Sequence, residues 1–278
     1  MTRYAITGST GHVGRRVAEI VAGELSLRLV VRDASRAPEL PETQVRVATY
    51  GDHEAAVAAL RGVDALFMVS AAESATRRQE HRTFIAAAAE AGVEHIVYTS
   101  FVGAAPDAVF TLGRDHGDAE VAIRESGMRH TLLRDNFYSD LLPYFADDAG
   151  VIRGPAGQGR VAALARADVA DVAVAVLRDL ASHVDATYQL TGPEALTMGE
   201  IAARAGAAIG RELTFHDETI DEAYASRAAF GAERWQLDAW VSTYLAIARG
   251  EVEAVTGDVE RLTGHPARRL EEALAVEI

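Results

Sequence analysis

Short apolar runs alternate with amphipathic segments through the first half of the chain. This alternation is typical of a parallel sheet with helices on both faces. The predicted strands lie at 3–7, 27–31, 45–48, 64–69, 95–99 and 130–134, and the predicted helices at 13–23, 53–61, 77–91 and 115–126. The run at 64–69 is apolar on both faces, which favours a central strand of the sheet.

The pattern loosens after residue 134. The glycine-rich segment 150–159 predicts a loop, and Asp168 is expected to cap a helix that ends near Leu180. The later elements are expected to be strands at 160–165 and 188–191, a helix at 198–209 closed by Gly210, and one short strand with several helices in 213–278. The predicted fold is α/β, with a doubly wound parallel sheet in residues 1–150. A smaller C-terminal α/β substrate lobe is expected in 151–278, partly interleaved with the first domain.

A glycine-rich turn joins the first predicted strand to the first predicted helix. Gly8, Gly11 and Gly14 would permit a tight turn, close approach of a pyrophosphate, and packing of the helix on the strand. The free N–H groups at the start of that helix would bind the phosphates. The other residues expected at this site are Ser9, Thr10, Val13 and, through its backbone N–H, His12. A strand before and a helix after are the context that a Rossmann dinucleotide turn requires.

Arg32 ends the second predicted strand, about 18 residues after Gly14. A residue near this distance normally reads the ribose of the bound dinucleotide. Arginine favours a 2′-phosphate at that position, so NADP(H) is the expected cofactor, and Arg36 is expected to assist.

The overall composition limits the function further. The chain has 278 residues, a formal net charge of −14 and no cysteine. This acidity disfavours nucleic acids and anionic membrane surfaces as partners, and no apolar run approaches the ~20 residues of a membrane span. With no signal-peptide pattern before Arg3, the expected compartment is the cytoplasm. All 27 Lys and Arg residues are arginine, which excludes every mechanism that needs a catalytic lysine.

Ligands of an open parallel sheet bind beyond the carboxyl ends of its strands. This rule adds Asp52, Ser70, Thr99, Asn136 and Phe137 to the residues expected at the cofactor. Asp52 has two compatible interpretations, since its carboxylate could accept from the adenine amine or cap the helix that follows. No metal site is expected, because the paired acids Asp147 and Asp148 fit a solvated surface better.

The chain resembles the NmrA-like group of atypical short-chain dehydrogenase/reductases, and especially the type 2 NADPH:quinone oxidoreductases. The resemblance covers essentially the whole chain. It rests on the segments 7–14, 31–33, 50–52, 98–100, 115–116 and 131–139, which read TGSTGHVG, VRD, YGD, YTS, DH and TLLRDNFYS. It implies a Rossmann domain that holds NADPH and a small C-terminal substrate lobe. The family contains reductases of quinones and other electrophiles, and members that bind the nucleotide only as redox sensors.

The same resemblance brings the catalytic residues into question. Short-chain dehydrogenases usually carry a Tyr-x-x-x-Lys pair, and those two positions fall on Leu112 and His116 in this chain. His116 could therefore act as proton donor or ribose ligand, or be a partly exposed histidine satisfied by water. Ser100 and Thr99 could face the substrate or satisfy their own backbone. Tyr138 could supply a hydroxyl or form part of the pocket wall.

Together these features predict an NADPH-dependent oxidoreductase that transfers hydride to a small electrophile such as a quinone, enone, carbonyl or imine. Two alternatives remain open: a regulatory protein that senses NADP(H) without catalysis, and an isomerase or epimerase with a recycled nicotinamide. The sequence leaves the substrate open and is compatible with a homodimer.

Overall fold

The computed structural model describes residues 2–277. The chain divides into two compact units, and it passes between them several times. Unit 1 comprises residues up to Ser100 together with Asp115–Arg134 and Val169–Tyr188, and unit 2 comprises Phe101–Arg114, Asp135–Asp168 and the residues from Gln189 onward. These units interleave more extensively than a single boundary at residue 150 describes.

The main sheet has seven strands in the order β3-β2-β1-β4-β5-β6-β9. The strands are β1 (Arg3–Thr7), β2 (Ser26–Val31), β3 (Gln44–Val47), β4 (Ala65–Met68), β5 (His95–Phe101), β6 (Arg129–Asp135) and β9 (Ala186–Leu190). β1 pairs in parallel with both β2 and β4, so the chain winds outward from β1 in two directions. The predicted doubly wound α/β sheet is confirmed, and its switch point lies between β1 and β4.

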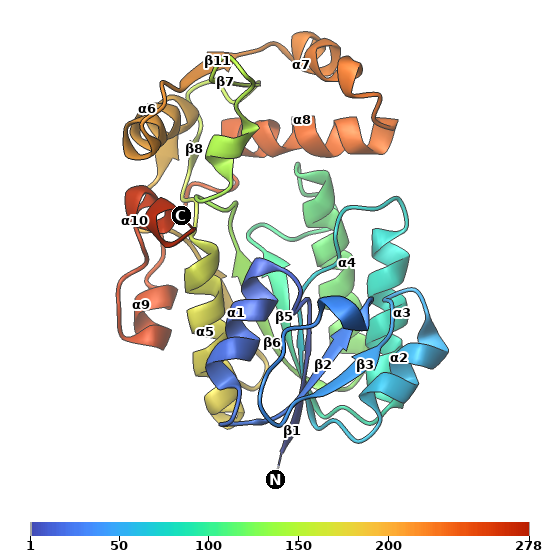
Figure 1. Ribbon diagram of the computed structural model, residues 1–278. Coiled ribbons are helices and arrows are strands. Elements are labelled where there is room, and N and C mark those ends of the chain that lie inside the picture. Colours follow the sequence, from blue (N-terminus) through green and yellow to red (C-terminus); the bar gives the residue numbers. More distant parts are fainter. Residues whose placement is uncertain (1, 278) are drawn as a thin grey trace. The chain divides into compact units, whose positions relative to one another are not determined.

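Helices cover both faces of this sheet. Figure 1 shows α1 and α5 on one face and α2, α3 and α4 on the other. Their bounds are α1 (His12–Val21), α2 (His53–Leu60), α3 (Arg77–Glu90), α4 (Thr111–Glu125) and α5 (Arg166–Arg178), with short 3₁₀ turns at η1 (Ala34–Arg36) and η3 (Leu180–His183). β4 and β5 are buried along their whole length, as expected for central parallel strands. The core between the sheet and α2–α4 contains Leu60, Phe84, Ile96 and Ile123.

Unit 2 contains two small sheets and most of the later helices. Its strands are β7 (Val151–Gly154), β8 (Arg160–Val161), β10 (Leu196–Thr197) and β11 (Thr214–Asp217), and its helices are α6 (Met198–Ile209), α7 (Ile220–Arg227), α8 (Arg234–Ala248), α9 (Asp258–Thr263) and α10 (Leu270–Glu277), with 3₁₀ turns η2 (Leu142–Phe145) and η4 (Ala228–Phe230). The helix predicted at 198–209 is confirmed. Thr197 and Glu200 form a capping box at its start, and Gly210 ends it with a φ of 68°.

Three predictions in this region are wrong. The segment predicted as a loop at 150–159 contains β7, which pairs in parallel with β11. The strand predicted at 160–165 has only the two residues of β8. Asp168 lies inside α5 and not at its cap, because the helix already begins at Arg166.

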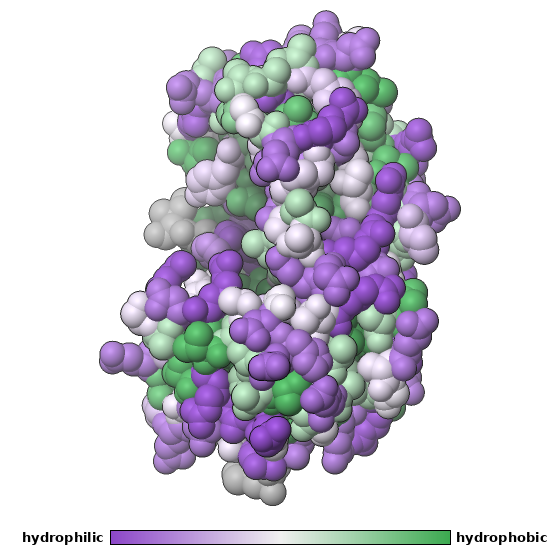
Figure 2. Space-filling view, turned by 90° about the vertical axis from the view of Figure 1, so that its right-hand side faces the viewer, coloured by the Kyte–Doolittle hydropathy of each residue, from purple (hydrophilic) through white to green (hydrophobic). Residues whose placement is uncertain are grey.

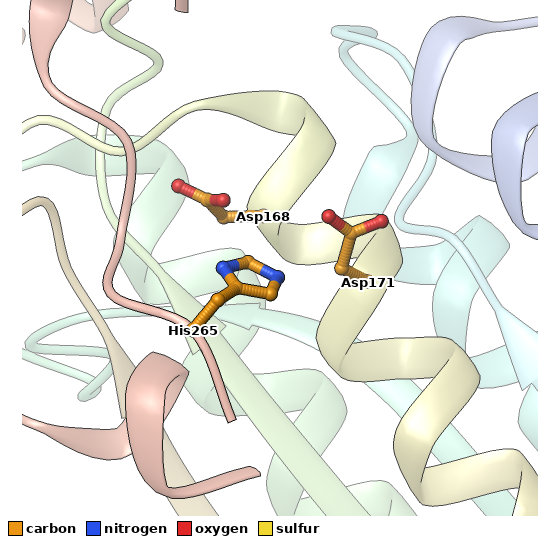
Figure 3. A group of neighbouring side chains, drawn as sticks. All are labelled: Asp168, Asp171 and His265. Atoms are coloured by element: carbon orange, nitrogen blue, oxygen red, sulfur yellow. The ribbon is translucent and has the colours of Figure 1, made fainter. Parts of the chain in front are cut away.

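The acidic side chains of α5 have arginine partners. Asp168 and Asp171 project from this helix, and His265 lies in the segment between α9 and α10 (Figure 3). Within unit 2, Asp168 accepts from the backbone N–H and the guanidinium of Arg268. Within unit 1, Asp171 accepts from Arg16 at 3.0 Å. We therefore assign these carboxylates to ion pairing with arginine.

Polar side chains dominate the face shown in Figure 2, and apolar residues form small patches between them. Among the helices of the described residues, none has both the length and the apolar character needed to cross a membrane.

Candidate functional site: a nucleotide cradle at the switch point

The turn between β1 and α1 assigns a different role to each of its glycines. Gly8 has a φ of +66°, which L side chains rarely adopt. Gly14 touches the turn so closely that a Cβ atom there would lie 2.5 Å from the Gly8 oxygen. A Cβ atom on Gly11 would meet nothing closer than that oxygen at 3.5 Å. Gly8 therefore makes the turn, Gly14 allows α1 to pack on β1, and Gly11 leaves its outer side open.

The groups around Gly11 suit a phosphate. The N-cap residue of α1 is Gly11, which has no side chain to cap the helix, and the first turn of the helix contains no acidic residue. The start of a helix of this kind favours an anion through its backbone N–H groups and its dipole. Ser9 adds a buried hydroxyl for which residues 2–277 provide no hydrogen-bond partner. A buried polar atom without a partner is costly, and a ligand oxygen would satisfy it.

A cavity of about 460 Å³ continues from this turn along the carboxyl ends of the strands. Its volume falls in the range of small-molecule sites, roughly 300–1,000 Å³. All of its lining residues belong to unit 1: Gly8, Thr10, Val30–Arg32, Ala48–Gly51, Val69–Ser74 and Glu80. The residues present therefore fit the pyrophosphate and adenosine parts of a dinucleotide.

The charges beside Arg32 favour an anion at the end of β2. Arg32 is exposed and lines the cavity. The neighbouring carboxylate of Asp33 is already engaged, because it accepts from the backbone N–H of Ser35 at 2.9 Å and from its hydroxyl at 2.7 Å. These hydrogen bonds from Ser35 lower the pKa of Asp33. Arg36 directly follows Ser35 and is the last residue of η1.

Of the other residues of unit 1 that are predicted near the cofactor, one lines the cavity and two lie outside its lining. Ser70 lines the cavity. Thr99 is buried, and its hydroxyl accepts from the backbone N–H of Ser70 at 2.8 Å, so it acts on the wall from behind. Asp52 caps α2 by accepting from the N–H of Ala55 at 3.0 Å, which is the capping interpretation, and the adjacent Gly51 forms part of the cavity wall.

A larger depression, of about 640 Å³, lies at the opposite end of the sheet. It is lined by the first residues of the strands, among them Arg3, Ala65, His95 and Arg129. Ligands of open parallel sheets bind at the carboxyl ends of the strands. Since the glycine turn and Arg32 both lie at those carboxyl ends, we place the functional site in the smaller cavity.

His116 is an interior residue, only 6% exposed. Its Nε2 lies 3.0 Å from Nη2 of Arg77, and its Nδ1 lies 3.1 Å from the hydroxyl of Tyr98. Because arginine can only donate, Nε2 accepts and the ring proton is on Nδ1. Burial, together with the charge of Arg77 and the neighbouring His81, lowers the pKa of His116 well below its usual value. The ring is therefore neutral near pH 7, and the general-acid role predicted for it does not fit this environment.

Ser100 is equally enclosed. Its hydroxyl is fully buried and donates to Glu120 at 2.6 Å. Glu120 also accepts two hydrogen bonds of 2.7 Å from Arg134. Burial opposes ionisation of Glu120, but the hydrogen bonds from Arg134 and Ser100 outweigh it and its pKa is lowered. Ser100 thus belongs to a charged interior network, and this geometry favours the structural one of its two interpretations.

The candidates on unit 2 follow β6. The amide of Asn136 is buried, where it donates to the carbonyl of Val252 and accepts from the backbone N–H of Phe137. Phe137 is half-buried and packs with Phe101 and Phe110 at ring distances of 4.9 and 5.1 Å. Tyr138 donates its hydroxyl proton to Asp135 at 2.6 Å. Burial and the charge of Asp135 raise the pKa of Tyr138 well above its usual value.

Sequence reasoning missed the buried groups that support the cavity wall. Tyr50 lines the cavity, and its hydroxyl lies 2.5 Å from both the Thr7 hydroxyl and the carbonyl of Val69. Arg77 and His81 both bond to the backbone of Ala71. One feature of the sequence could have indicated these groups: Arg77 is a charged residue at the first position of the helix that follows the cavity-lining loop.

Comparison with known proteins agrees with this geometry. Residues 8–180 match a family of proteins described as NAD(P)H-binding. The chain belongs to this NAD(P)H-binding family. It is 32% identical to quinone oxidoreductase 2 of Escherichia coli, covering 98% of this chain and 97% of that protein. It is 36% identical to a (4-alkanoyl-5-oxo-2,5-dihydrofuran-3-yl)methyl phosphate reductase of Streptomyces griseus, covering 95% and 93%.

Comparison with solved structures extends the match to the fold. The NADPH complex of the Escherichia coli quinone oxidoreductase QOR2 superposes with a TM-score of 0.87, at 31% identity and 99% coverage of both chains. The transcriptional regulator NmrA superposes with a TM-score of 0.73 at 14% identity, and that likeness shows the fold alone. The predicted membership in the NmrA-like reductases and the prediction of NADP(H) as cofactor are confirmed.

The three glycine roles predict a matched pair of variants. Gly11→Ala should fold with wild-type stability, because its Cβ has room, but should bind NADPH roughly tenfold or more weakly, because the Cβ stands where the pyrophosphate approaches. Gly14→Ala should lower the free energy of unfolding by about 1–3 kcal/mol, because its Cβ overlaps the Gly8 backbone. Thermal melts and calorimetric NADPH titrations measure both effects. A Gly11→Ala protein with wild-type affinity would contradict the assignment.

Proposed function

We propose that this chain transfers hydride from NADPH to a quinone or to a similarly conjugated, electron-poor acceptor. The chain is an NAD(P)H-dependent oxidoreductase, in keeping with three full-length relatives at 32–36% identity: a quinone oxidoreductase, an azoreductase and the (4-alkanoyl-5-oxo-2,5-dihydrofuran-3-yl)methyl phosphate reductase. The class of acceptor is the part that is proposed.

One observation supports this class of acceptor: each of the predicted proton donors already makes a hydrogen bond to another group of the protein. The imidazole of His116 is neutral and held by Arg77, and the hydroxyl of Ser100 is committed to Glu120. The hydroxyl of Tyr138 is committed to Asp135. With no lysine in the chain, none of these groups is poised to protonate an alkoxide near neutral pH.

Quinone reduction suits such a site. A quinone that becomes a hydroquinone takes up one hydride and one proton. The phenolate formed on the way is a far weaker base than an alkoxide, so water can supply the proton. Reduction of a simple aldehyde or ketone yields an alkoxide and therefore depends more on a positioned acid, which typically contributes ~10²–10⁴-fold.

The cofactor supplies the hydride when it is bound, and the chain contributes binding and orientation. We assign the pyrophosphate to the N–H groups around Gly11 and to Ser9, the adenosine to the unit 1 cavity, and the 2′-phosphate to Arg32 with Arg36. The nicotinamide end remains the predicted place for Asn136, Phe137 and Tyr138.

The sensor and isomerase alternatives have weaker support. NmrA and a nucleoside-diphosphate-sugar epimerase of Staphylococcus aureus resemble this chain at 14% and 23% identity, so they share its fold only. We therefore do not propose a regulatory partner or an epimerase reaction. A homodimer remains a prediction.

Cofactor choice tests the role of Arg32. Wild-type protein should bind NADPH roughly ten- to a hundredfold more tightly than NADH, because a charge-assisted contact to the 2′-phosphate has about this strength. Arg32→Ala should remove most of that preference and leave NADH affinity nearly unchanged. Arg46→Ala, an exposed arginine of β3 outside the cavity lining, is the matched control. Equal affinities in the wild type would exclude this assignment.

The acceptor class is tested by following NADPH oxidation with a panel of quinones, azo dyes and simple aldehydes. Quinones should be turned over at least about a hundredfold faster than the aldehydes. Because His116 is already neutral in the fold, the rate with quinone should show no inflection due to this residue between about pH 6 and 8. Aldehyde turnover as fast as quinone turnover would overturn the acceptor class. A protein that binds NADPH and reduces nothing would favour the sensor.

A further inference from the structure

The loop between β4 and α3 forms one wall of the nucleotide cavity. Its residues Val69–Ser74 line the cavity, yet the loop has no regular secondary structure. A segment of this kind has few backbone partners of its own and is among the first parts of a protein to open. What holds the loop therefore decides the shape of the cavity.

Side chains from behind the wall supply those partners. At the start of the loop, the N–H of Val69 donates to Thr7 and its carbonyl accepts from Tyr50. The N–H of Ser70 donates to Thr99. This first part of the loop is thus fixed to neighbouring elements of the sheet.

Ala71 is held in the same way, and both of its backbone groups are bonded. Its N–H donates to Nε2 of His81 at 2.9 Å, and its carbonyl accepts from Nε of Arg77 at 2.9 Å. Both side chains come from α3, and they are 0% and 4% exposed, respectively. The loop is therefore tied back to the helix that follows it.

The hydrogen bond from Ala71 to Nε2 of His81 has a cost at the other nitrogen of the same ring. Because Nε2 accepts, the ring proton is on Nδ1, and this atom is buried without a hydrogen-bond partner in residues 2–277. Burial and the charge of Arg77 lower the pKa of His81 to about 3, so the ring stays neutral at physiological pH. The interior tolerates an unsatisfied N–H so that Ala71 can be held.

The guanidinium of Arg77 also contacts two groups of α4. Its Nη2 lies 3.0 Å from Nε2 of His116, and its Nη1 lies 3.6 Å from a carboxylate oxygen of Asp115. The His116 ring is held in turn by the hydroxyl of Tyr98 in β5. A continuous line of buried contacts thus runs from β5 and α4 through the guanidinium to the carbonyl of Ala71.

We infer that Arg77 is a positioning residue for the dinucleotide, and that His116 serves the same task by orienting Arg77. The inference rests on the proposed function, because the cavity wall has a role only if it holds NADPH. It gives His116 a task that uses its acceptor nitrogen and needs no proton transfer. Arg77 acts on the cofactor through the backbone of Ala71 and does not itself line the cavity.

The first experiment replaces Arg77 with methionine, which keeps most of the stem and removes every donor. Hydrogen exchange in the ligand-free protein should accelerate in a peptide that spans 69–76, and the Kd for NADPH should rise roughly ten- to a hundredfold. The kcat at saturating NADPH should stay within about twofold of wild type, because the bound cofactor restores the wall. The control is Arg82→Gln, since Arg82 lies on the same helix and bonds to Asp118 rather than to the loop or to Asp115.

The second experiment separates orientation from acid chemistry and remains decisive if Arg77→Met does not fold. His116→Gln keeps an acceptor for Arg77, whereas His116→Leu does not. We expect His116→Gln to retain the NADPH affinity and loop exchange of the wild type, and His116→Leu to raise the Kd roughly three- to tenfold with faster exchange at 69–76. Equal turnover losses in both variants with unchanged Kd would overturn the inference in favour of an acid.

The two proposals fail separately. If the wild type does not bind NADPH, the proposed function fails. If the wild type binds NADPH but a folded Arg77→Met protein shows unchanged exchange at 69–76 and unchanged Kd, only the positioning inference fails.

Discussion

The nucleotide side of this molecule depends on the contact between α1 and the turn that precedes it. Gly14 lies so close to Gly8 that a single added carbon would overlap the Gly8 backbone. This approach brings the first N–H groups of α1 to the open side of Gly11, beside the cavity between the ends of β2, β3 and β4. The geometry of the glycine turn depends on this contact, and the parallel pairing of β1 with β2 brings Arg32, at the end of β2, to the same cavity as Gly8.

Buried polar networks support the residues around the site. Glu120 with Ser100 and Arg134, and Arg77 with His116, are groups whose residue types suggest chemistry. In the structure they satisfy one another, and a buried polar group without a partner would be costly. These groups therefore hold the ends of the strands and the cavity wall. Hydride transfer depends instead on how the cofactor binds and on which acceptor is used.

The sequence predicted the parts of the fold that depend on local pattern. The spacing of Gly8, Gly11 and Gly14 and the position of Arg32 follow from the strand–turn–helix signal, and the structure places Gly8 and Arg32 at one cavity. The strand β7 was hidden because its partner β11 begins at Thr214, far along the chain from Val151, and such pairing leaves no local signal. The environment of His116 was hidden for the same reason, since Arg77 reaches it from another helix.

Residues with two local uses could not be resolved from the sequence. Asp52 could cap α2 or bind adenine, and only the position of its carboxylate shows the cap. Asp168 stands in a sequence typical of a helix cap, but α5 starts earlier and the carboxylate pairs with Arg268 instead. In each case the deciding partner or boundary is set by the tertiary structure.

The central claim is that the turn at Gly11 and the cavity beside Arg32 form one dinucleotide site. A crystal structure of the protein grown with NADPH tests it most directly. The account predicts the pyrophosphate against the N–H groups around Gly11, the adenosine between 48–51 and 69–74, and the 2′-phosphate in contact with the Arg32 guanidinium. A nucleotide bound in the depression at the amino ends of the strands, or one whose 2′-phosphate points away from Arg32, would contradict it.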